Sequence, residues 1–271
     1  MKLIEEFLQG KTGKAEENED FMFFSENFAA VIDGVTAKRP EMAGTGRIAA
    51  EIIHREIFRL PAETTWEEAL EIFTQAIFSH YQQTGIAEAA RHDPRLRMGA
   101  VTAVFSVFHR EIWLMGDCQC LINGHFYENP ASIDAVMSEA RALYNHIALQ
   151  TGKNVEDLAS HDPGREFISP ILQQQSLLQN NPAAGEYAFF VIDGFTPMKN
   201  QVKIISVNKG DEIVLATDGY PRLSPTLEAS EKKLREIITR DPMLISLYKS
   251  TKGVKKGNIS FDDRAYLRFL F

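Results

Sequence analysis

The segment 28–34 reads FAAVIDG and the segment 213–219 reads IVLATDG, so each is an apolar run that ends in Asp-Gly. A third acidic element, Asp262-Asp263, precedes the largely apolar run 265–271. Such runs, bounded by turn residues, predict buried β-strands. Carboxylates at strand ends can meet when strands pack face to face, and they repel one another unless a cation lies between them. The pattern therefore predicts a hard-metal site of the Mg²⁺ or Mn²⁺ type.

The composition is ordinary for a soluble globular protein, with 271 residues, 44% hydrophobic and 24% charged. This length allows one domain with a sizeable core. A net charge of −8 disfavours a nucleic-acid partner, which would need a basic face. The N-terminus has no long apolar run, so we expect no signal peptide and no membrane anchor. Cys118 and Cys120 lack a second cysteine pair for zinc, and we interpret them as strand residues of a cytoplasmic protein.

Hydrophobic periodicity predicts an α+β protein. Thr65 and Glu68 have the spacing of a helix capping box, and Asn123-Gly124 is a strong hairpin signal. The stretch from about 130 to 184 is helical and polar, which predicts an insertion or flap between strands. Strands are expected at 2–9, 20–24, 27–33, 98–108, 111–117, 119–127, 186–193, 201–207, 211–217 and 264–271, and helices at 43–59, 66–83 and 226–249.

The order of these motifs resembles that of the metal-dependent protein phosphatases, the PPM or protein phosphatase 2C family, and points to a bacterial member. The resemblance extends over nearly the whole chain. It rests on Asn18-Glu19-Asp20, on VIDG at 31–34, GAVTAV at 99–104, LMGD at 114–117, LATDG at 215–219 and DDRA at 262–265. It implies one domain over residues 1–271, folded as a four-layer αββα sandwich of two antiparallel sheets flanked by helices.

The resemblance also implies the site. Asp33 would bridge two Mn²⁺ or Mg²⁺ ions, the carbonyl of Gly34 would ligate one of them, and Asp218 and Asp262 would hold the other. Glu19 would contact a metal through water. Two such ions lower the pKa of a shared water and neutralise charge on a phosphoryl group. The implied activity is direct hydrolysis of phosphoserine or phosphothreonine in a phosphorylated protein substrate, with Asp33, Asp218 and Asp262 as the catalytic set.

Two further carboxylates complete the implied site. Asp20 would order the water around the metal ions. Asp117 matches the residue that helps to hold a third, weaker metal in many family members.

One position departs from the family pattern. The family usually carries, four residues before the Glu of this element, an Arg that grips the substrate phosphate, and this chain has Ala15 there. Lys14 is the candidate substitute, as a point charge without the bidentate fork of Arg.

Two alternatives stay open beside a protein phosphatase. One is a phosphatase-like binding or regulatory module with weak or no catalysis, and the other is a phosphatase of small phosphate esters. Taken singly, Asp33 and Asp218 could also be turn residues before Gly.

Overall fold

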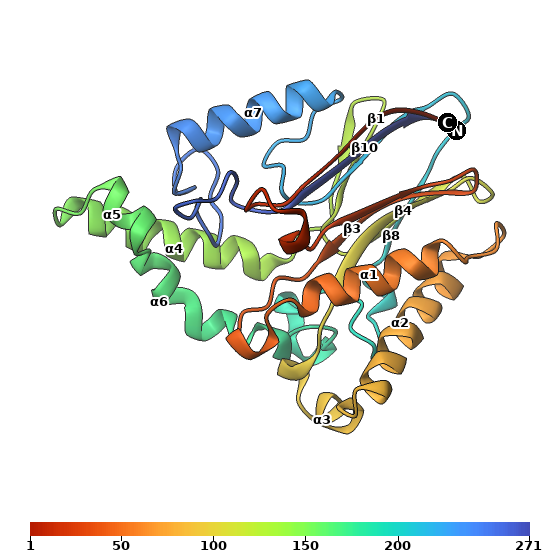
Figure 1. Ribbon diagram of the computed structural model, residues 1–271, viewed down its shortest axis with the longest axis horizontal. Coiled ribbons are helices and arrows are strands. Elements are labelled where there is room, and N and C mark those ends of the chain that lie inside the picture. Colours follow the sequence, from red (N-terminus) through yellow and green to blue (C-terminus); the bar gives the residue numbers. More distant parts are fainter.

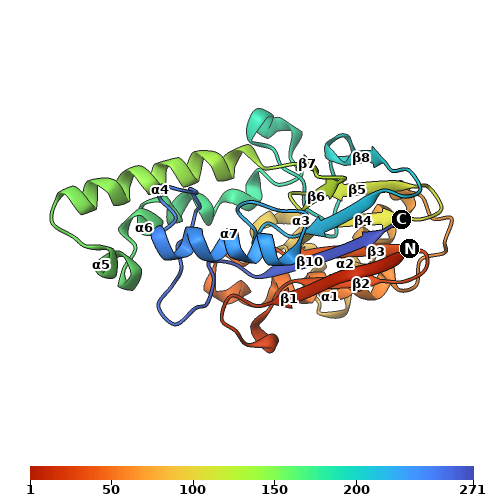
Figure 2. The same cartoon turned by 90° about the horizontal axis from the view of Figure 1, so that it is seen from above.

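A computed structural model describes residues 1–271 as two five-stranded antiparallel sheets that pack face to face (Figures 1 and 2). One sheet has the order β1-β10-β9-β6-β7 and the other β2-β3-β4-β5-β8. The strands are β1 (Lys2–Gln9), β2 (Phe21–Phe24), β3 (Phe28–Gly34), β4 (Ala100–Ser106), β5 (Glu111–Met115), β6 (Gln119–Ile122), β7 (His125–Tyr127), β8 (Lys203–Ser206), β9 (Glu212–Ala216) and β10 (Arg264–Leu270). The helices are α1 (Thr45–Ile57), α2 (Trp66–Gln83), α3 (Ala87–His92), α4 (Ser132–Gln150), α5 (Val155–Ser160), α6 (Pro163–Leu172) and α7 (Leu227–Arg240).

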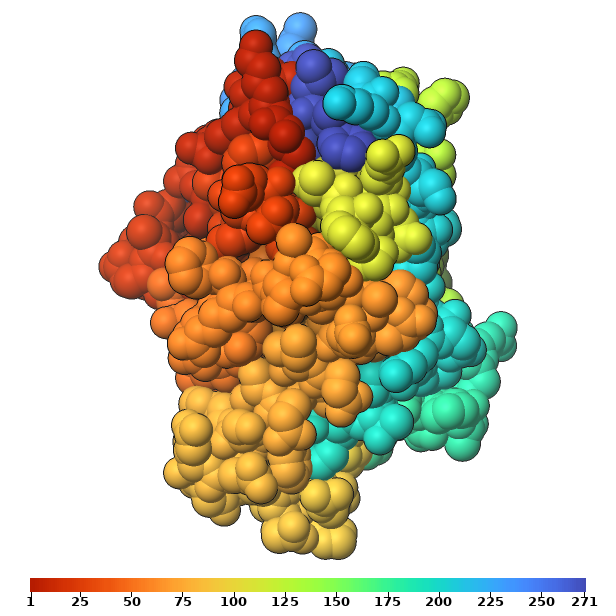
Figure 3. Space-filling model, turned by 90° about the vertical axis from the view of Figure 1, so that its right-hand side faces the viewer, coloured from red at the N-terminus to blue at the C-terminus, as the bar shows by residue number.

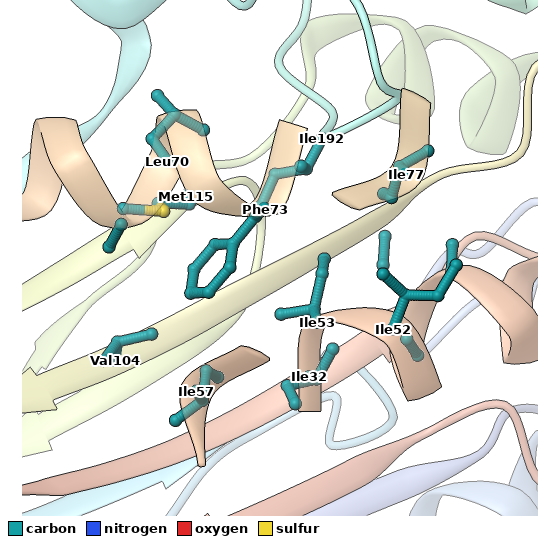
Figure 4. Close-up of a cluster of buried hydrophobic side chains, with 14 of the residues drawn as sticks. Ile32, Ile52, Ile53, Ile57, Leu70, Phe73, Ile77, Val104, Met115 and Ile192 are labelled. Atoms are coloured by element: carbon teal, nitrogen blue, oxygen red, sulfur yellow. The ribbon is translucent and has the colours of Figure 1, made fainter. Parts of the chain in front are cut away.

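Helices cover the outer face of each sheet and complete the expected αββα sandwich. Helices α1 and α2 pack on the β2-β3-β4-β5-β8 sheet, where Phe73 and Ile53 meet Ile32 and Val104 in a dense apolar cluster (Figure 4). On the other sheet, Leu227 at the start of α7 packs against a smaller cluster of Leu121, Val214, Ala216, Tyr220 and Tyr266. Both helices over the first sheet are amphipathic, so burial of one face drives this packing.

Side chains alternate along β3 and supply two cores at once. Ala29 and Val31 point into the apolar layer between the sheets, whereas Ala30 and Ile32 face α1 and α2. Asp33 has the same parity as Ala29 and Val31. The period of a strand therefore directs this carboxylate toward the space between the sheets, at the end where β3 stops.

The chain termini mark the opposite end of the sandwich. Lys2 pairs with Leu270 at one end of the β1–β10 ladder, and Gln9 pairs with Arg264 at the other. The N and C marks lie side by side at this end in Figures 1 and 2, and Figure 3 faces it, with the first segment of the chain in red beside the last in dark blue. Asp262 and Asp263 precede Arg264, so they lie at the end away from the termini.

Most expected elements are confirmed. The strand over 2–9, the helix over 66–83 with its capping box of Thr65 and Glu68, and the last strand agree with the sequence prediction within a residue or two. The expected strand over 119–127 is two strands, because Asn123 and Gly124 form the hairpin turn with positive φ angles of 52° and 82°. Helix α3 was not predicted. Cys118 and Cys120 are free and buried in the core between the sheets.

The strand expected over 186–193 is wrong. This segment is irregular and makes only isolated bridges, such as Ala100 with Ile192. The side chain of Asn180 explains the difference, since its amide nitrogen donates to the carbonyl of Val191 at 2.6 Å and its oxygen accepts from the Val191 N–H at 3.4 Å. The backbone groups that a continuous ladder would use are satisfied by a side chain instead.

Of the stretch 226–249, which was expected to be filled by helices, only α7 is helical, and it ends at Arg240. Pro242 disfavours helical geometry at Asp241, and the Asp241 carboxylate accepts hydrogen bonds from the N–H groups of Ile245, Ser246 and Leu247. These bonds fold the following residues into a compact loop. The loop leads to residues 248–252, which line the candidate site described below.

The stretch predicted to be helical, residues 130–184, contains α4, α5 and α6, which project from the sandwich (Figure 1). Arg141 on α4 is fully buried and ties this segment to the loop after α7. Its guanidinium donates to Asp162 Oδ2 at 2.6 Å and 2.9 Å and to the carbonyl of Ser250 at 2.8 Å. None of the helices is both long and apolar enough to cross a membrane.

Candidate metal and phosphate site

Strand register brings four of the predicted carboxylates to one end of the sandwich. β3 and β5 both pair antiparallel with β4, so Asp33 and Asp117 lie at the same end of one sheet. In the other sheet Ala216 pairs with Tyr266, which places Asp218, just after β9, beside Asp262, just before β10. All four carboxylates line a single cleft of about 570 Å³. Residues 128–138, 188–203 and 248–252 contribute its walls.

Asp33, Asp117 and Asp218 form what we call the open cluster. No lysine or arginine makes an ion pair with any of the three. Burial, followed by the charge of neighbouring carboxylates, raises the pKa of Asp117 to about 8 and that of Asp218 to about 6. The same causes hold the pKa of Asp33 well above its usual range. With no cationic side chain paired to them, these groups favour their protonated form in the metal-free protein, and a bound cation would favour their charged form.

Glu19, Asp262 and Asp263, with Lys11 and Lys252, form the paired cluster. The Lys11 ammonium lies 3.0 Å from Asp263 Oδ2 and 3.5 Å from both Asp262 Oδ1 and Glu19 Oε2. Lys252 makes a second ion pair with Asp262. Although burial opposes it, the charges of Lys252 and Lys11 keep the pKa of Asp262 below its usual value. Charge in this cluster is thus compensated by the chain itself.

Asp20 lies behind both clusters and is buried. Its Oδ2 accepts a hydrogen bond from the Thr217 hydroxyl at 2.7 Å, and its N–H donates to Asn18 Oδ1 at 3.1 Å. Burial raises the pKa of Asp20, and the Thr217 hydrogen bond only partly offsets this. Asp20 therefore connects the Asn18-Glu19-Asp20 element to the end of β9, and it does not line the cleft.

A contact between two glycines fixes the backbone next to Asp33. A Cβ added at Gly34 would lie 2.6 Å from the carbonyl of Gly46 and 2.7 Å from the backbone oxygen of Glu19. A Cβ added at Gly46 would lie 2.9 Å from the carbonyl carbon of Gly34. The first turn of α1 can approach the end of β3 this closely only because neither residue has a side chain. This approach sets the position of the Gly34 carbonyl, which is a predicted metal ligand.

Four lysines are among the residues that line the cleft, together with the acidic Glu128 and Asp134. The lysines are Lys38, Lys203, Lys249 and Lys252. Burial, together with the charges of Lys252 and Arg165, lowers the pKa of Lys38 to about 8. A cleft lined by both carboxylates and ammonium groups can accept a divalent cation and an anionic group together.

Lys14, the predicted phosphate-binding residue, is not brought to this cleft. Its side chain is 60% exposed and pairs with Glu17 at 2.6 Å. Sequence reasoning assigned no role to the lysines that do reach the site, Lys11, Lys38 and Lys252. The pairing of Gln9 with Arg264 brings Lys11 close to Asp263. This register joins two segments that are far apart in the sequence, so it could not be predicted from local patterns. Lys252 lies in an irregular loop and has no local sequence signal.

Comparison with solved structures adds to this geometry. The crystal structure of the serine/threonine phosphatase PstP/Ppp of Mycobacterium tuberculosis superposes with a TM-score of 0.51 at 12% sequence identity, covering 99% of this chain and 98% of that one. The serine/threonine phosphatase Stp1 of Staphylococcus aureus gives a TM-score of 0.51 at 15% identity, covering 100% and 95%. This chain has the fold of the PPM-type serine/threonine phosphatases. No protein-family model matches the sequence, and no curated protein matches it.

A third structure, the PstP catalytic domain in complex with two manganese ions, has a TM-score of 0.49 at 11% identity, covering 97% of this chain and 96% of that one. In the present chain, no three carboxylate, histidine or cysteine side chains are arranged closely enough to hold a metal ion as they stand. The open cluster nevertheless fits a hard cation in its chemistry, because its carboxyl groups line the cleft and no lysine or arginine pairs with them. Asp262 fits less well, since two lysines already pair with it.

Proposed function

We propose that this protein is a metal-dependent phosphomonoester hydrolase that removes phosphate from phosphoserine or phosphothreonine in proteins. The observation that carries the proposal is the cleft at the end of a PPM-type sandwich, which is lined by carboxylates without ion-pair partners and by several ammonium groups. Asp33, Asp117 and Asp218, with the carbonyl of Gly34, would hold a Mn²⁺ or Mg²⁺ ion. When bound, the ion supplies charge neutralisation at the phosphoryl group and a more acidic water.

The remaining work falls to side chains of the chain itself. Lys252 and Lys38 face the cleft and would bind the phosphoryl oxygens, in place of the arginine that is replaced by Ala15. Lysine gives a point charge rather than a bidentate fork, so orientation of the phosphate depends on having more than one ammonium group. The raised pKa of Asp117, about 8, lets this carboxyl hold a proton near neutral pH until a cation replaces it.

The cleft is wide enough for a phosphorylated side chain. Its volume of about 570 Å³ lies within the range of sites that enclose small ligands. Part of the wall comes from the loop 248–252, which Arg141 fastens to α4. A peptide that carries a phosphoserine would enter past this loop, and a free phosphate ester would need no such contact.

A direct test is hydrolysis of a phosphothreonine peptide and of p-nitrophenyl phosphate with Mn²⁺, with Mg²⁺ and with chelator. We expect turnover that needs the metal and that favours the peptide. Preference for the small ester would instead identify a phosphatase of small molecules. Absence of turnover under all conditions, with an intact fold, would overturn the proposal.

A second candidate function is a phosphatase-like binding module with little or no catalysis. The ion pairs of Lys11 and Lys252 with Asp262 favour it, because they engage a residue that the family would use for metal. Such a module would retain phosphopeptide binding in the presence of Mn²⁺ while showing no hydrolysis. Equilibrium binding of a phosphothreonine peptide, measured beside the turnover assay, distinguishes the two.

A further inference from the structure

The Lys11 ammonium lies where several oxygen atoms converge. Besides the three carboxylates of the paired cluster, the Thr36 hydroxyl oxygen is 3.3 Å from Lys11 Nζ. The Thr36 hydroxyl itself donates to Glu19 Oε2 at 2.7 Å. Four side chains from three different parts of the sequence thus surround one ammonium group, and only 18% of the Lys11 side chain is exposed. Oxygen atoms from several side chains surround a bound metal cation in the same way, but here the group at the centre is the Lys11 ammonium.

The backbone holds Lys11 in place at both of its polar groups. Its N–H donates to Asp263 Oδ1 at 2.7 Å, and its carbonyl accepts from the N–H of Ile259 at 2.9 Å. Asp263 also accepts from the N–H of Glu19 at 3.2 Å. The Asp263 carboxylate therefore accepts three hydrogen bonds, two from Lys11 and one from Glu19, and the Lys11 ammonium neutralises its charge. A surface lysine that had merely folded over a carboxylate would have neither anchor.

The two clusters differ in the source of their positive charge. The open cluster needs an ion from solution, whereas the paired cluster contains a covalently attached cation. Oxygens that bind a divalent ion lie roughly 2.1 Å from it, about 1 Å closer than those around Lys11. An ammonium and a metal ion could not share this space, because like charges so close repel strongly.

We infer that Lys11 is a built-in cation that takes the place of one of the two metal ions expected from the PPM fold. The chain then binds one divalent ion, at the open cluster, and the second positive charge of the site cannot dissociate. This inference rests on the proposed function only in taking these carboxylates as cation ligands, and it requires no turnover. Removal of the ammonium would make the oxygens that now face it available to a second ion, namely Glu19 Oε2, Thr36 Oγ1, Asp262 Oδ1 and Asp263 Oδ2, while Lys252 stays paired with Asp262 Oδ2.

The test is a count of bound Mn²⁺ per chain by equilibrium dialysis of the full-length protein. We expect one ion in the unmodified chain and two in Lys11→Met. The matched control is Lys14→Met, which makes the same substitution three residues away at an exposed lysine and should leave the count at one. Electron paramagnetic resonance gives an independent reading, since two neighbouring Mn²⁺ ions couple and an isolated ion does not.

Each outcome of the count is decisive. An extra ion in Lys11→Met but not in Lys14→Met supports the inference, whatever the activity of either protein. Equal counts in the unmodified chain and in Lys11→Met overturn it, because the lysine then displaces nothing. If Lys11→Met does not fold, Lys11→Gln keeps hydrogen-bond donors without the charge and supplies the count. Absence of turnover in the unmodified chain, together with an extra ion in Lys11→Met, would refute the proposed function and leave this inference standing.

Discussion

The open and paired clusters lie at the same end of the same sandwich and contain similar numbers of carboxylates, yet their electrostatics are opposite. In the open cluster, burial and mutual repulsion raise the pKa values of Asp33, Asp117 and Asp218. In the paired cluster, Lys11 and Lys252 hold the pKa of Asp262 below its usual value, against the effect of its burial. The comparison teaches that the ability to bind a cation depends on what already neutralises the carboxylates, and the position of the carboxylates alone does not determine it.

The largest expected effect comes from removing charge in the open cluster. Asp33→Asn should lower metal-dependent turnover by on the order of 10³-fold or more, since a bound cation contributes several kcal/mol of transition-state stabilisation. The same substitution should raise the melting temperature of the metal-free protein, because it relieves repulsion. Steady-state kinetics and thermal unfolding in chelator measure the two effects. Unchanged turnover would remove Asp33 from the site.

The matched substitution in the paired cluster should act in the opposite direction on stability. Asp263→Asn removes the charge nearest to the Lys11 ammonium, so we expect the free energy of unfolding to fall by roughly 2–3 kcal/mol. Denaturant titration of the metal-free protein measures it. A gain in stability here would mean that the ion pair between Lys11 and Asp263 does not stabilise the fold, and it would contradict the electrostatic difference between the two clusters.

The stability of the metal-free protein should fall between pH 6.5 and pH 8. Groups whose folded pKa is raised, as in the open cluster, stabilise the fold at low pH and lose that contribution as the pH rises through the folded value. One extra proton held by the folded state over this window is worth about 2 kcal/mol, or roughly 4–8 °C in melting temperature. Two groups act oppositely. Burial lowers the pKa of His54, whose contribution ends about one pH unit above the usual histidine value, and it lowers the pKa of Lys38 to about 8, so that the contribution of Lys38 begins only near the top of the window. The raised pKa values of Asp33 and Asp117 outweigh both.

Added Mn²⁺ supplies the control for this pH series. It should raise the melting temperature most at pH 8 and so flatten the dependence, since the cation takes the role of the protons. A stability that rises from pH 6.5 to 8 in chelator would show that the open cluster is neutralised by some other group. Asp262, with a lowered pKa, titrates below this window and does not confuse the result.

The smallest effect is expected at Lys14. Because its side chain is exposed and pairs only with Glu17, Lys14→Ala should change the Michaelis constant for a phosphothreonine peptide by less than about twofold. A larger increase would restore Lys14 as a phosphate-binding residue and would require its loop to move toward the cleft. Lys252→Ala, which removes an ammonium group from the cleft wall, is the positive control.

The sequence predicted the fold well and the site only in part. Runs such as residues 28–34 and 264–270 carry their strand signal locally, so their ends and the carboxylates at those ends could be located without a structure. Asp33, Asp117, Asp218 and Asp262 do line one cleft. The roles of these carboxylates as metal ligands remain predictions.

The partners of those carboxylates could not be predicted. Lys11 meets Asp263 across 252 positions of sequence, and Lys252 lies in a loop without periodicity. The segment 186–193 looked like a strand because its apolar residues are buried, but Asn180 satisfies the backbone of Val191 instead. Side chains that satisfy distant charges or backbone groups leave no periodic signal, and this is where sequence reasoning failed.

The contact between Gly34 and Gly46 has a consequence for laboratory evolution of this protein. Neither residue has a group that can react or bind, but any larger residue at either position would push α1 away from β3 and displace Asp33. In a library of random variants selected for activity, both positions should stay fixed while exposed residues of α1 vary freely. Substitutions intended to alter the specificity of the cleft are therefore better placed at the lysines that line it than at the contact between Gly34 and Gly46.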